Sequence, residues 1–292
     1  MKDRIEIEAH AKINLALDIT GKRPDGYHEV RMIMQGIALC DRIRIERIPR
    51  KEIVGRKIIL KNSLPYLPSG KGNLAYDAAA LFRKYAGTED GVIVELEKHI
   101  PVAAGLAGGS ADAAAVLQGM NELFETGYSE QELRELGLKL GADVPFCVMG
   151  GTALSEGIGE KLIKLPEAPR FHVVLVKPPV GLSTKEVYQR FDGAANPSHP
   201  DVDGMIHAIG EKDFLGVAAK LGNVLEPVSR AMCPEITEIE RQMKSFGCEG
   251  ALMSGSGPTV FGLFTDRGRA NAAYMHFKIG RKSGQTFLTE FA

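Results

Sequence analysis

The alternation of apolar and polar residues predicts that the chain begins with β-structure. A period of two is typical of half-buried strands, and it runs through three segments of the first fifty residues: 5–17, 30–39 and 42–48. The sequence Pro24-Asp25-Gly26 predicts a turn between the first two segments. Residues 49–72 are rich in Lys, Pro and Gly, and we expect them to form an exposed excursion.

Strand-like and helix-like segments are mixed in the rest of the chain. Apolar residues spaced by three and four predict helices, which cover residues 73–85, 111–124, 130–140, 184–191, 211–221, 234–246 and 268–278. The predicted strands cover residues 91–98, 171–176, 285–290 and two short runs joined by glycines within 251–264. Because strand and helix do not alternate steadily, the pattern favours an α+β fold over a doubly wound parallel sheet.

A Pro-containing segment, Leu165–Pro169, is the best candidate for a domain boundary. A chain of 292 residues is long enough for one large domain or for two of ordinary size. We expect two domains, residues 1–165 and 166–292, with a polar loop at residues 195–204 in the second.

The segment from Pro101 to Ala113 consists almost only of small residues and joins a predicted strand to a predicted helix. We expect Ser110 to be the N-cap, so that the glycines lie where the helix leaves its first N–H groups unpaired. A loop without side chains lets an anion reach the backbone, and the helix dipole favours negative charge. The segment therefore predicts a phosphate-binding loop, and the alternative is a tight structural connection. Its glycine spacing excludes both the P-loop and the dinucleotide-binding loop.

Several polar residues are candidates for chemistry, and each has a structural alternative. Lys12 and Asn14 lie two residues apart on an apolar strand and project from one face, which is either a site or the solvent side of an edge strand. Asp143 stands two residues before Pro145, the ordinary position of a helix N-cap. Asp112 complements the helix dipole, but it would repel a bare triphosphate unless Mg²⁺ or a Lys lies nearby.

Three loop segments also carry candidates. Tyr27 and His28 follow the first turn, where they either stack on a ligand or pack the turn. Residues 254–257, Ser-Gly-Ser-Gly, form either a second anion-binding nest or a hairpin turn. The remaining candidate is a metal-like cluster on a Pro/Gly loop, for which a solvated loop is the favoured interpretation: His199, Asp201, Asp203 and His207.

Composition excludes several classes of function. Hydrophobic residues make up 44% and charged residues 25% of the chain, as in soluble globular proteins. The net charge of −1 and the lack of a basic block argue against nucleic-acid binding. A charged start and the lack of a long apolar run argue against a signal peptide and a membrane span. The four scattered cysteines suggest neither a zinc site nor disulfides, so we expect a reduced, cytoplasmic protein, monomeric or homodimeric.

Four segments together resemble the motifs of the GHMP small-molecule kinases. Residues 101–113, P-x-A-A-G-L-A-G-G-S-A-D-A, resemble the second motif, and residues 254–259 resemble the third. Residues 11–15 with 23–28 resemble the first motif, and residues 140–146 resemble the catalytic segment. The segments occur in the family's order over residues 11–260. The pairing of P-D-G-Y-H with G-A-D-V-P is typical of the branch that phosphorylates a cytidine diphosphate sugar alcohol in non-mevalonate isoprenoid precursor synthesis.

This resemblance implies a fold and a set of ligands. The fold would be a two-domain α+β kinase, with an N-terminal domain like ribosomal S5 domain 2 that has a left-handed βαβ unit, an exception to the usual hand. The C-terminal domain would be ferredoxin-like. ATP and Mg²⁺ would be required, with Ser110 near the metal and with Asn73 and Lys98 on the adenine side. The loop that would bind the ATP phosphates consists of Pro101, Val102, Ala103, Ala104, Gly105, Leu106, Ala107, Gly108, Gly109, Ser110 and Ala111.

The resemblance also implies roles in catalysis and substrate binding. Asp143 would be the general base that takes the proton of the substrate hydroxyl, and Lys12 would keep Asp143 ionised and stabilise the alkoxide. The residues that would bind the substrate are Asn14, Tyr27, His28 and Tyr188.

Two features depart from the family pattern. Ala104 and Ala107 replace glycines that are common in the loop, and Tyr188 stands where Phe is common. The alternatives are another GHMP kinase, of the homoserine or mevalonate type, and a non-catalytic nucleotide-binding relative. The former would not carry Tyr27 and His28 together with G-A-D-V-P, and the latter would have lost Lys12, Asp143 or the loop.

Overall fold

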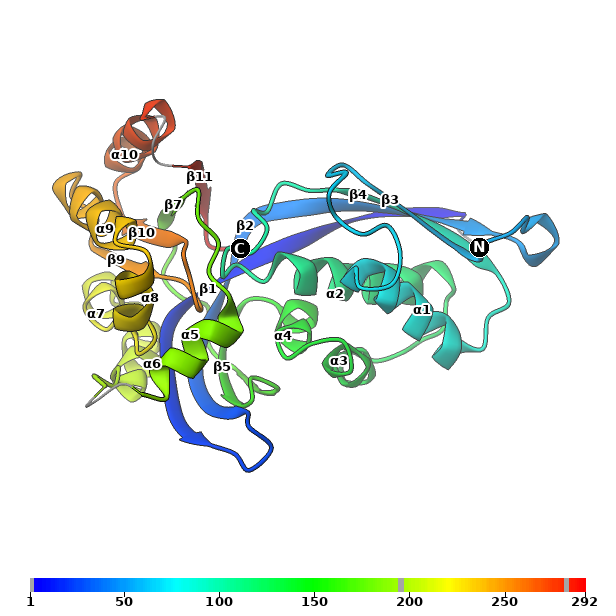
Figure 1. The fold of residues 1–292 in the computed structure, drawn as a ribbon, viewed down its shortest axis with the longest axis horizontal. Helices are drawn as coiled ribbons and strands as arrows, with labels where there is room; N and C mark the ends of the chain where they lie inside the picture. The colour runs from blue at the N-terminus through cyan, green and yellow to red at the C-terminus, as the bar shows by residue number, and fades with distance from the viewer. Residues whose placement is uncertain (1–2, 194–196, 281–283) are drawn as a thin grey trace. The chain divides into compact units, whose positions relative to one another are not determined.

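The computed structural model describes residues 3–193, 197–280 and 284–292, which form two compact units. Unit 1 comprises residues 1–11, 40–100 and 107–150, and unit 2 comprises residues 12–39, 101–106 and 151–292. Two long strands, β1 (Arg4–Lys22) and β2 (His28–Ile48), contribute residues to both units (Figure 1). The predicted division of the chain at residue 165 stays a prediction.

Unit 1 consists of a sheet and a layer of helices. Its strands follow the order β3-β4-β2-β1. β3 (Ile58–Asn62) lies parallel to β4 (Gly91–Glu97), which lies antiparallel to residues 42–48 of β2. α1 (Leu74–Ala86) joins the two parallel strands and packs against α2 (Gly108–Leu123) on one face of the sheet (Figure 1). The other helices of the unit are η1 (Arg50–Glu52, 3₁₀), α3 (Glu130–Leu138) and α4 (Val144–Met149).

α2 approaches the sheet closely because it is rich in glycine and alanine. A Cβ atom at Gly119 would lie 2.8 Å from Cδ1 of Ile45 on β2, so a larger residue does not fit there without a shift. Val116 and Leu117 of the same helix are fully buried. This close packing holds the N-terminus of α2, where the small-residue loop ends, at a defined place beside the sheet.

Unit 2 contains the second half of β1, the first half of β2 and a second sheet. β5 (Thr152–Gly157) pairs antiparallel with residues 30–35 of β2 and with β6 (Lys161–Lys164), while β8 (Gly222–Asn223) lies parallel to β1 at residues 16–17. The second sheet is antiparallel, in the order β11-β7-β10-β9. Its strands are β7 (His172–Lys177), β9 (Gly250–Met253), β10 (Val260–Phe264) and β11 (Gln285–Glu290).

The second sheet and two helices form a ferredoxin-like arrangement. In chain order, β7, α9 (Glu235–Ser245), β9, β10, α10 (Arg267–Ile279) and β11 make a β-α-β-β-α-β unit with strand order 4-1-3-2. One core holds it together, in which Met243 of α9 and Phe277 of α10 pack with Val174 and Phe264 of the sheet. The other helices of unit 2 are α5 (Thr184–Phe191), α6 (Val202–Gly210), α7 (Phe214–Ala219) and α8 (Glu226–Met232).

The start of α2 differs from the prediction. The helix begins at Gly108 after Ala107, whose φ of 57° is left-handed, so Ser110 lies inside the first turn and is not the N-cap. The left-handed Ala107 ends the loop, and the helix begins with the next residue. The predicted Ser110 cap is therefore wrong, while its hydroxyl stays in the first turn.

Other differences concern short elements. The excursion at 49–72 contains η1 and β3, which were not predicted because each is only three to five residues long. α8 was missed because it is only seven residues long and has Pro in its first turn. The predicted loop at 195–204 ends early, because the side chain of Asp201 accepts a hydrogen bond from Gly204 N and caps α6. Residues 195 and 196 of that prediction lie outside the described residues.

Candidate active site

The small-residue loop has the backbone of an anion-binding nest. Ala103, Gly105 and Ala107 have left-handed φ values of 50°, 74° and 57°, and α2 follows directly. Left-handed residues that alternate with others turn successive backbone N–H groups toward a common point. The loop therefore presents backbone N–H groups together with the positive end of a sixteen-residue helix. Ala104 is not among the left-handed residues, so replacing a glycine there introduces no backbone strain.

Two glycines of the loop touch neighbouring atoms. A Cβ atom at Gly105 would lie 2.2 Å from the carbonyl oxygen of Ser254, and one at Gly108 would lie 2.9 Å from Cγ2 of Ile100. Contacts shorter than about 3 Å are not tolerated by a real Cβ atom. Glycine at these two positions is required by the packing, whether or not a ligand binds.

Segments from three motifs meet at Gly105. The ammonium of Lys12 donates to Asn14 Oδ1 at 2.8 Å and to Gly105 O at 3.4 Å. The hydroxyl of Ser254 donates to the same carbonyl at 3.0 Å. Lys12 is only 4% exposed and Asn14 is fully buried, so the alternative of a solvent-facing edge strand is wrong. A buried ammonium needs polar groups around it, which makes this cluster a candidate for the functional site.

The loop at Ser254 is held by β8 and α8. Asn223 Nδ2 donates to the carbonyls of Met253 and Gly255 at 2.9 and 2.8 Å. Glu226 Oε1 accepts from Met253 N at 2.9 Å, and Ser229 Oγ donates to Ser256 O at 3.1 Å. The loop is thus a braced backbone segment rather than a plain hairpin turn. Sequence reasoning missed Asn223, because a single polar residue between two predicted helices carries no signal.

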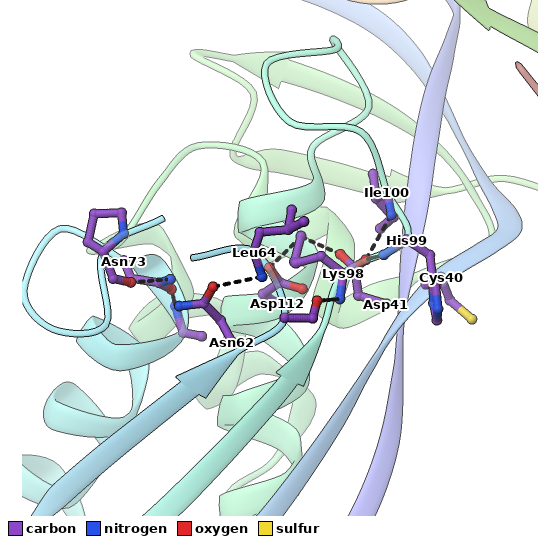
Figure 2. Close-up of polar contacts among 12 residues, drawn as sticks. Cys40, Asp41, Asn62, Leu64, Asn73, Lys98, His99, Ile100 and Asp112 are labelled. Carbon is purple, nitrogen blue, oxygen red and sulfur yellow. Dashed lines mark hydrogen bonds and ion pairs between the residues drawn. The ribbon is translucent and has the colours of Figure 1, made fainter. Parts of the chain in front are cut away.

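A buried group of three charges lies beside the ends of the small-residue loop (Figure 2). Lys98 Nζ bonds Asp41 Oδ2 and, at 2.7 Å, Asp112 Oδ2, and all three side chains are almost fully buried. Asp41 Oδ1 also accepts the backbone N–H groups of His99 and Ile100. Lys98 precedes the loop and Asp112 follows the first turn of α2, so these bonds connect the chain on both sides of the loop.

The charges in this group do not balance. Two carboxylates share one ammonium, and Asp112 Oδ1 has no hydrogen-bond partner among the described residues. Burial raises the pKa of Asp112 to about 8; the nearby Lys98 opposes this rise, and the charge of Asp41 adds to it. Burial therefore favours the protonated form of Asp112 near neutral pH.

The strand pattern contained a signal for this group that our sequence analysis did not use. Asp41 is in phase with the buried Ile43 and Ile45, and Lys98 is in phase with Val94 and Leu96. Arg42 lies opposite Glu97 in the antiparallel pair, so the next opposed positions are Asp41 and Lys98. Opposite charges in the inward phase of two neighbouring strands predict a buried ion pair, provided that the register is known.

Asn73 and Lys98, which were predicted near adenine, both have structural partners. Asn73 caps α1, since its Oδ1 accepts from Ala75 N at 3.0 Å while its Nδ2 donates to Pro68 O at 2.9 Å (Figure 2). The ammonium of Lys98 is bound by Asp41 and Asp112. Their role beside adenine stays a prediction.

Asp143 occupies the N-cap position of α4 but does not cap it. Its backbone is right-handed helical, with φ −82° and ψ −15°, and its carboxylate makes no cap hydrogen bond. A capping aspartate has extended backbone and accepts from the first turn. The segment lies beside α2, because a Cβ atom at Gly141 would be 4.0 Å from Ser110 Oγ. The simple capping explanation for Asp143 is therefore wrong.

The predicted substrate residues of the first turn meet α5. His28 Nε2 lies 2.7 Å from Asp192 Oδ1, and the His28 ring lies 5.0 Å from the Tyr188 ring at 49°. Tyr27 is 61% exposed, and its N–H donates to Asp25 Oδ1 at 3.1 Å within the turn. The structure thus brings His28 and Tyr188 together and leaves the ring of Tyr27 exposed to solvent.

The metal-like residues have other partners. His199 pairs with Asp18 at 2.6 Å, Asp203 pairs with Arg31 at 2.6 Å, and Asp201 caps α6. Within the described ranges, no group of three or more His, Cys, Asp or Glu side chains is arranged to hold a metal. None of the helices that the structure describes is both long enough and apolar enough to span a membrane.

The family model for the GHMP kinases N terminal domain matches residues 73–151, and that for the GHMP kinases C terminal matches residues 205–278. The chain is 50% identical over 289 residues to the 4-diphosphocytidyl-2-C-methyl-D-erythritol kinase of Lachnoclostridium phytofermentans. This alignment covers 99% of this chain and 98% of that protein.

Solved structures give the same result. A crystal structure of 4-(cytidine 5'-diphospho)-2C-methyl-D-erythritol kinase superposes with a TM-score of 0.81 at 33% identity and covers 99% of both chains. A homoserine kinase from Cytophaga hutchinsonii has a TM-score of 0.79 at 19% identity. The superposition covers 100% of this chain and 95% of the homoserine kinase chain. The second likeness concerns the fold alone.

The proton on Asp112 predicts how stability depends on pH. Its folded pKa of about 8 lies above the ordinary value of 3.8, so the unfolded state loses this proton first as the pH rises. The free energy of unfolding should then fall between about pH 4 and pH 8, by at most about 1.4 kcal/mol per pH unit from this group. Asp112→Asn, which mimics the protonated acid, should remove this contribution.

Urea denaturation at pH 5.5, 7.0 and 8.5 measures the effect. As the pH rises, the free energy of unfolding of Asp112→Asn should increase relative to that of the unmodified protein. Glu211→Gln, at an exposed position, should leave the dependence of the unfolding free energy on pH unchanged. Parallel curves for Asp112→Asn and the unmodified protein would mean that Asp112 is ionised throughout.

Proposed function

We infer that this chain, which belongs to the GHMP kinase family, transfers phosphate from ATP to the 2-hydroxyl of 4-diphosphocytidyl-2-C-methyl-D-erythritol in non-mevalonate isoprenoid precursor synthesis. The predicted two-domain α+β fold, of the S5 domain 2-like and ferredoxin-like types, is confirmed. The observation that carries the kinase assignment is the meeting of three motif segments at Gly105, where a buried Lys12 and Ser254 bond one carbonyl.

We assign ATP binding to the loop of residues 101–111. Left-handed residues and the N-terminus of α2 offer N–H groups and a positive dipole end to the phosphates. Transfer of a phosphoryl group is catalysed chiefly by positioning and by charge stabilisation, so a rigid cradle is the main requirement. The close contacts of Gly105 and Gly108 with neighbouring backbone and side chain supply that rigidity.

Mg²⁺ is the metal we propose for this site. A magnesium ion in such enzymes is held largely by substrate phosphates and water with one or two protein groups, so a cluster of protein ligands is not needed. The Ser110 hydroxyl, in the first turn of α2, is the side chain that fits this role, and Asp112, whose Oδ1 has no hydrogen-bond partner among the described residues, lies two residues further along the helix. Mg²⁺ neutralises charge on the transferred phosphate when bound.

We assign the general base to Asp143. Its carboxylate is not used to cap α4, and a carboxylate is suited to take the proton of a hydroxyl as the oxygen–phosphorus bond forms. Lys12 is assigned the role of favouring the ionised carboxylate and of stabilising the developing alkoxide. Asn14, which accepts a hydrogen bond from Lys12, fixes the direction of the ammonium.

We assign the cytosine ring of the substrate to Tyr27, His28 and Tyr188. The aromatic rings of Tyr27 and Tyr188 would enclose the base, and His28 would bond its Watson–Crick edge. The contact between the His28 and Tyr188 rings supports this assignment. The partners we propose are accordingly two small molecules, ATP and the cytidine diphosphate sugar alcohol, for a cytoplasmic protein that is a monomer or a homodimer.

Replacing the proposed base tests the chemistry. Asp143→Asn should lower kcat by about 10²–10⁴-fold, because that is the usual contribution of general base catalysis, and should leave the affinity for ATP nearly unchanged. Lys12→Ala should also abolish turnover. Asp213→Asn is a matched control, because Asp213 is another N-cap aspartate without a cap hydrogen bond. A near-normal kcat for Asp143→Asn would remove Asp143 from the mechanism.

The loop is tested by adding a side chain. Gly108→Val should raise the KM for ATP strongly or abolish ATP binding, because its Cβ would collide with Ile100 and displace the backbone that meets the phosphates. Gly210→Val serves as the control, since nothing lies within 4 Å of a Cβ there. If Gly108→Val bound ATP with normal affinity and only lowered the melting temperature, the loop would be a structural turn without a role in ATP binding.

Substrate specificity is tested with a uridine analogue. The protein should prefer the cytidine substrate, because a site built to bond an amino group rejects a carbonyl at that position. His28→Ala should lose this preference. The measurement is the steady-state kcat/KM for both substrates. Equal values in the unmodified protein would contradict the cytidine assignment and would indicate a GHMP kinase that acts on a smaller alcohol.

A further inference from the structure

Asp192, which ends α5, is bonded to two side chains of the first hairpin. Its Oδ1 lies 2.7 Å from His28 Nε2, and its Oδ2 lies 2.6 Å from Lys22 Nζ. The side chain of Asp192 is 31% exposed, whereas that of His28 is only 9% exposed. Hydrogen bonds from Lys22 and from His28 hold the pKa of Asp192 below its usual value, so Asp192 is a carboxylate at neutral pH.

The charge state of Asp192 decides which nitrogen of His28 carries the proton. A carboxylate accepts hydrogen bonds and cannot donate them, so the 2.7 Å contact requires Nε2–H as the donor. In a neutral imidazole, Nδ1 then keeps its lone pair and acts as an acceptor. The described residues place no hydrogen-bond partner on Nδ1 of His28.

The same helix fixes the orientation of the ring. Tyr188 and Asp192 are four residues apart and so lie on one face of α5. Tyr188 contacts the ring of His28, and Asp192 bonds its edge, which defines both the plane and the rotation of the imidazole. At the other end of α5, Thr184 Oγ1 and Ser256 Oγ lie 2.8 Å apart, which ties this helix to the braced Ser254 loop.

We propose that Asp192 is a positioning residue that sets the tautomer of His28 and thereby selects cytosine over uracil. The proposal rests on the proposed function, in which His28 bonds the Watson–Crick edge of the base. With Nδ1 as an acceptor, His28 takes a hydrogen bond from the exocyclic amino group of cytosine. Uracil has a carbonyl there, and two acceptors facing each other leave both without a donor.

Removing Asp192 should reduce the discrimination of the protein between the cytidine substrate and its uridine analogue. Without the carboxylate, His28 can place its proton on Nδ1 and donate to the uracil carbonyl. The kcat/KM for the cytidine substrate should fall while that for the uridine analogue should hold or rise. Lys22, which is half-exposed, keeps Asp192 ionised, so Lys22→Met should change the ratio in the same direction but by less.

The test compares Asp192→Asn and Asp192→Ala with the full-length protein. We expect the ratio of kcat/KM for the cytidine substrate to that for its uridine analogue to drop by about tenfold or more, since an unmatched buried hydrogen-bonding group discriminates by at least that factor. Asp18→Asn is the control, because Asp18 also pairs with a histidine, Nδ1 of His199, outside the proposed base site. It should leave the ratio unchanged.

A spectroscopic measurement reads the tautomer directly. The ¹⁵N shifts of the His28 ring, assigned with His28→Gln, should report Nε2–H in the unmodified protein and a mixture in Asp192→Asn. An unchanged substrate ratio or an unchanged His28 tautomer in both Asp192 variants would overturn the proposal, including the case in which both substrates lose activity equally. A lack of cytidine preference in the unmodified protein would instead contradict the proposed function.

Discussion

The bond between Lys98 and two buried carboxylates is the interaction on which unit 1 depends. It joins β2, the residue that follows β4 and the start of α2 just after its first turn. Breaking a buried ion pair by removing one partner typically costs about 3–5 kcal/mol, because the remaining charge is left without compensation. The residues on both sides of the loop 101–107 belong to this group. The positions of the two ends of the loop are therefore set by the sheet and α2 rather than by the loop's own side chains.

Unit 2 has a comparable centre in the carbonyl of Gly105. Lys12, from a long strand, and Ser254, from a loop that Asn223 and Glu226 brace, both donate to it. A single backbone atom thus brings together residues separated by more than two hundred positions in the chain. Because each unit is organised around a buried polar group, the polar residues set the geometry while the apolar core supplies the driving force for folding.

Sequence patterns were informative where the signal is local. The helix at 184–191 and the strand at 285–290 were predicted with the bounds that the structure has, because a cap or a clear period marks their ends. Lys12 and Asn14 were correctly placed on one face, since this follows from the period of a strand. Whether that face was buried could not be predicted from two residues alone.

What failed to be predicted depends on pairing between distant segments. Asp41 and Lys98 belong together only once the register of β2 and β4 is known, and Asp192 meets His28 only when α5 is placed against the hairpin. The N-terminus of α2 was misplaced by three residues because a left-handed alanine, unlike a left-handed glycine, has no sequence signature.

The left-handed alanines of the loop have a consequence for ligand binding. An alanine has fewer accessible backbone conformations than a glycine in the unfolded chain, and a left-handed alanine is strained by roughly 1 kcal/mol. Ala103 and Ala107 adopt this conformation in the folded protein, so the free energy of folding offsets the strain. An all-glycine loop would instead lose its conformational entropy when a nucleotide arrives. In the nucleotide-binding role that we propose for this loop, part of the entropic penalty of binding would thus be met during folding, and the loop would be preorganised.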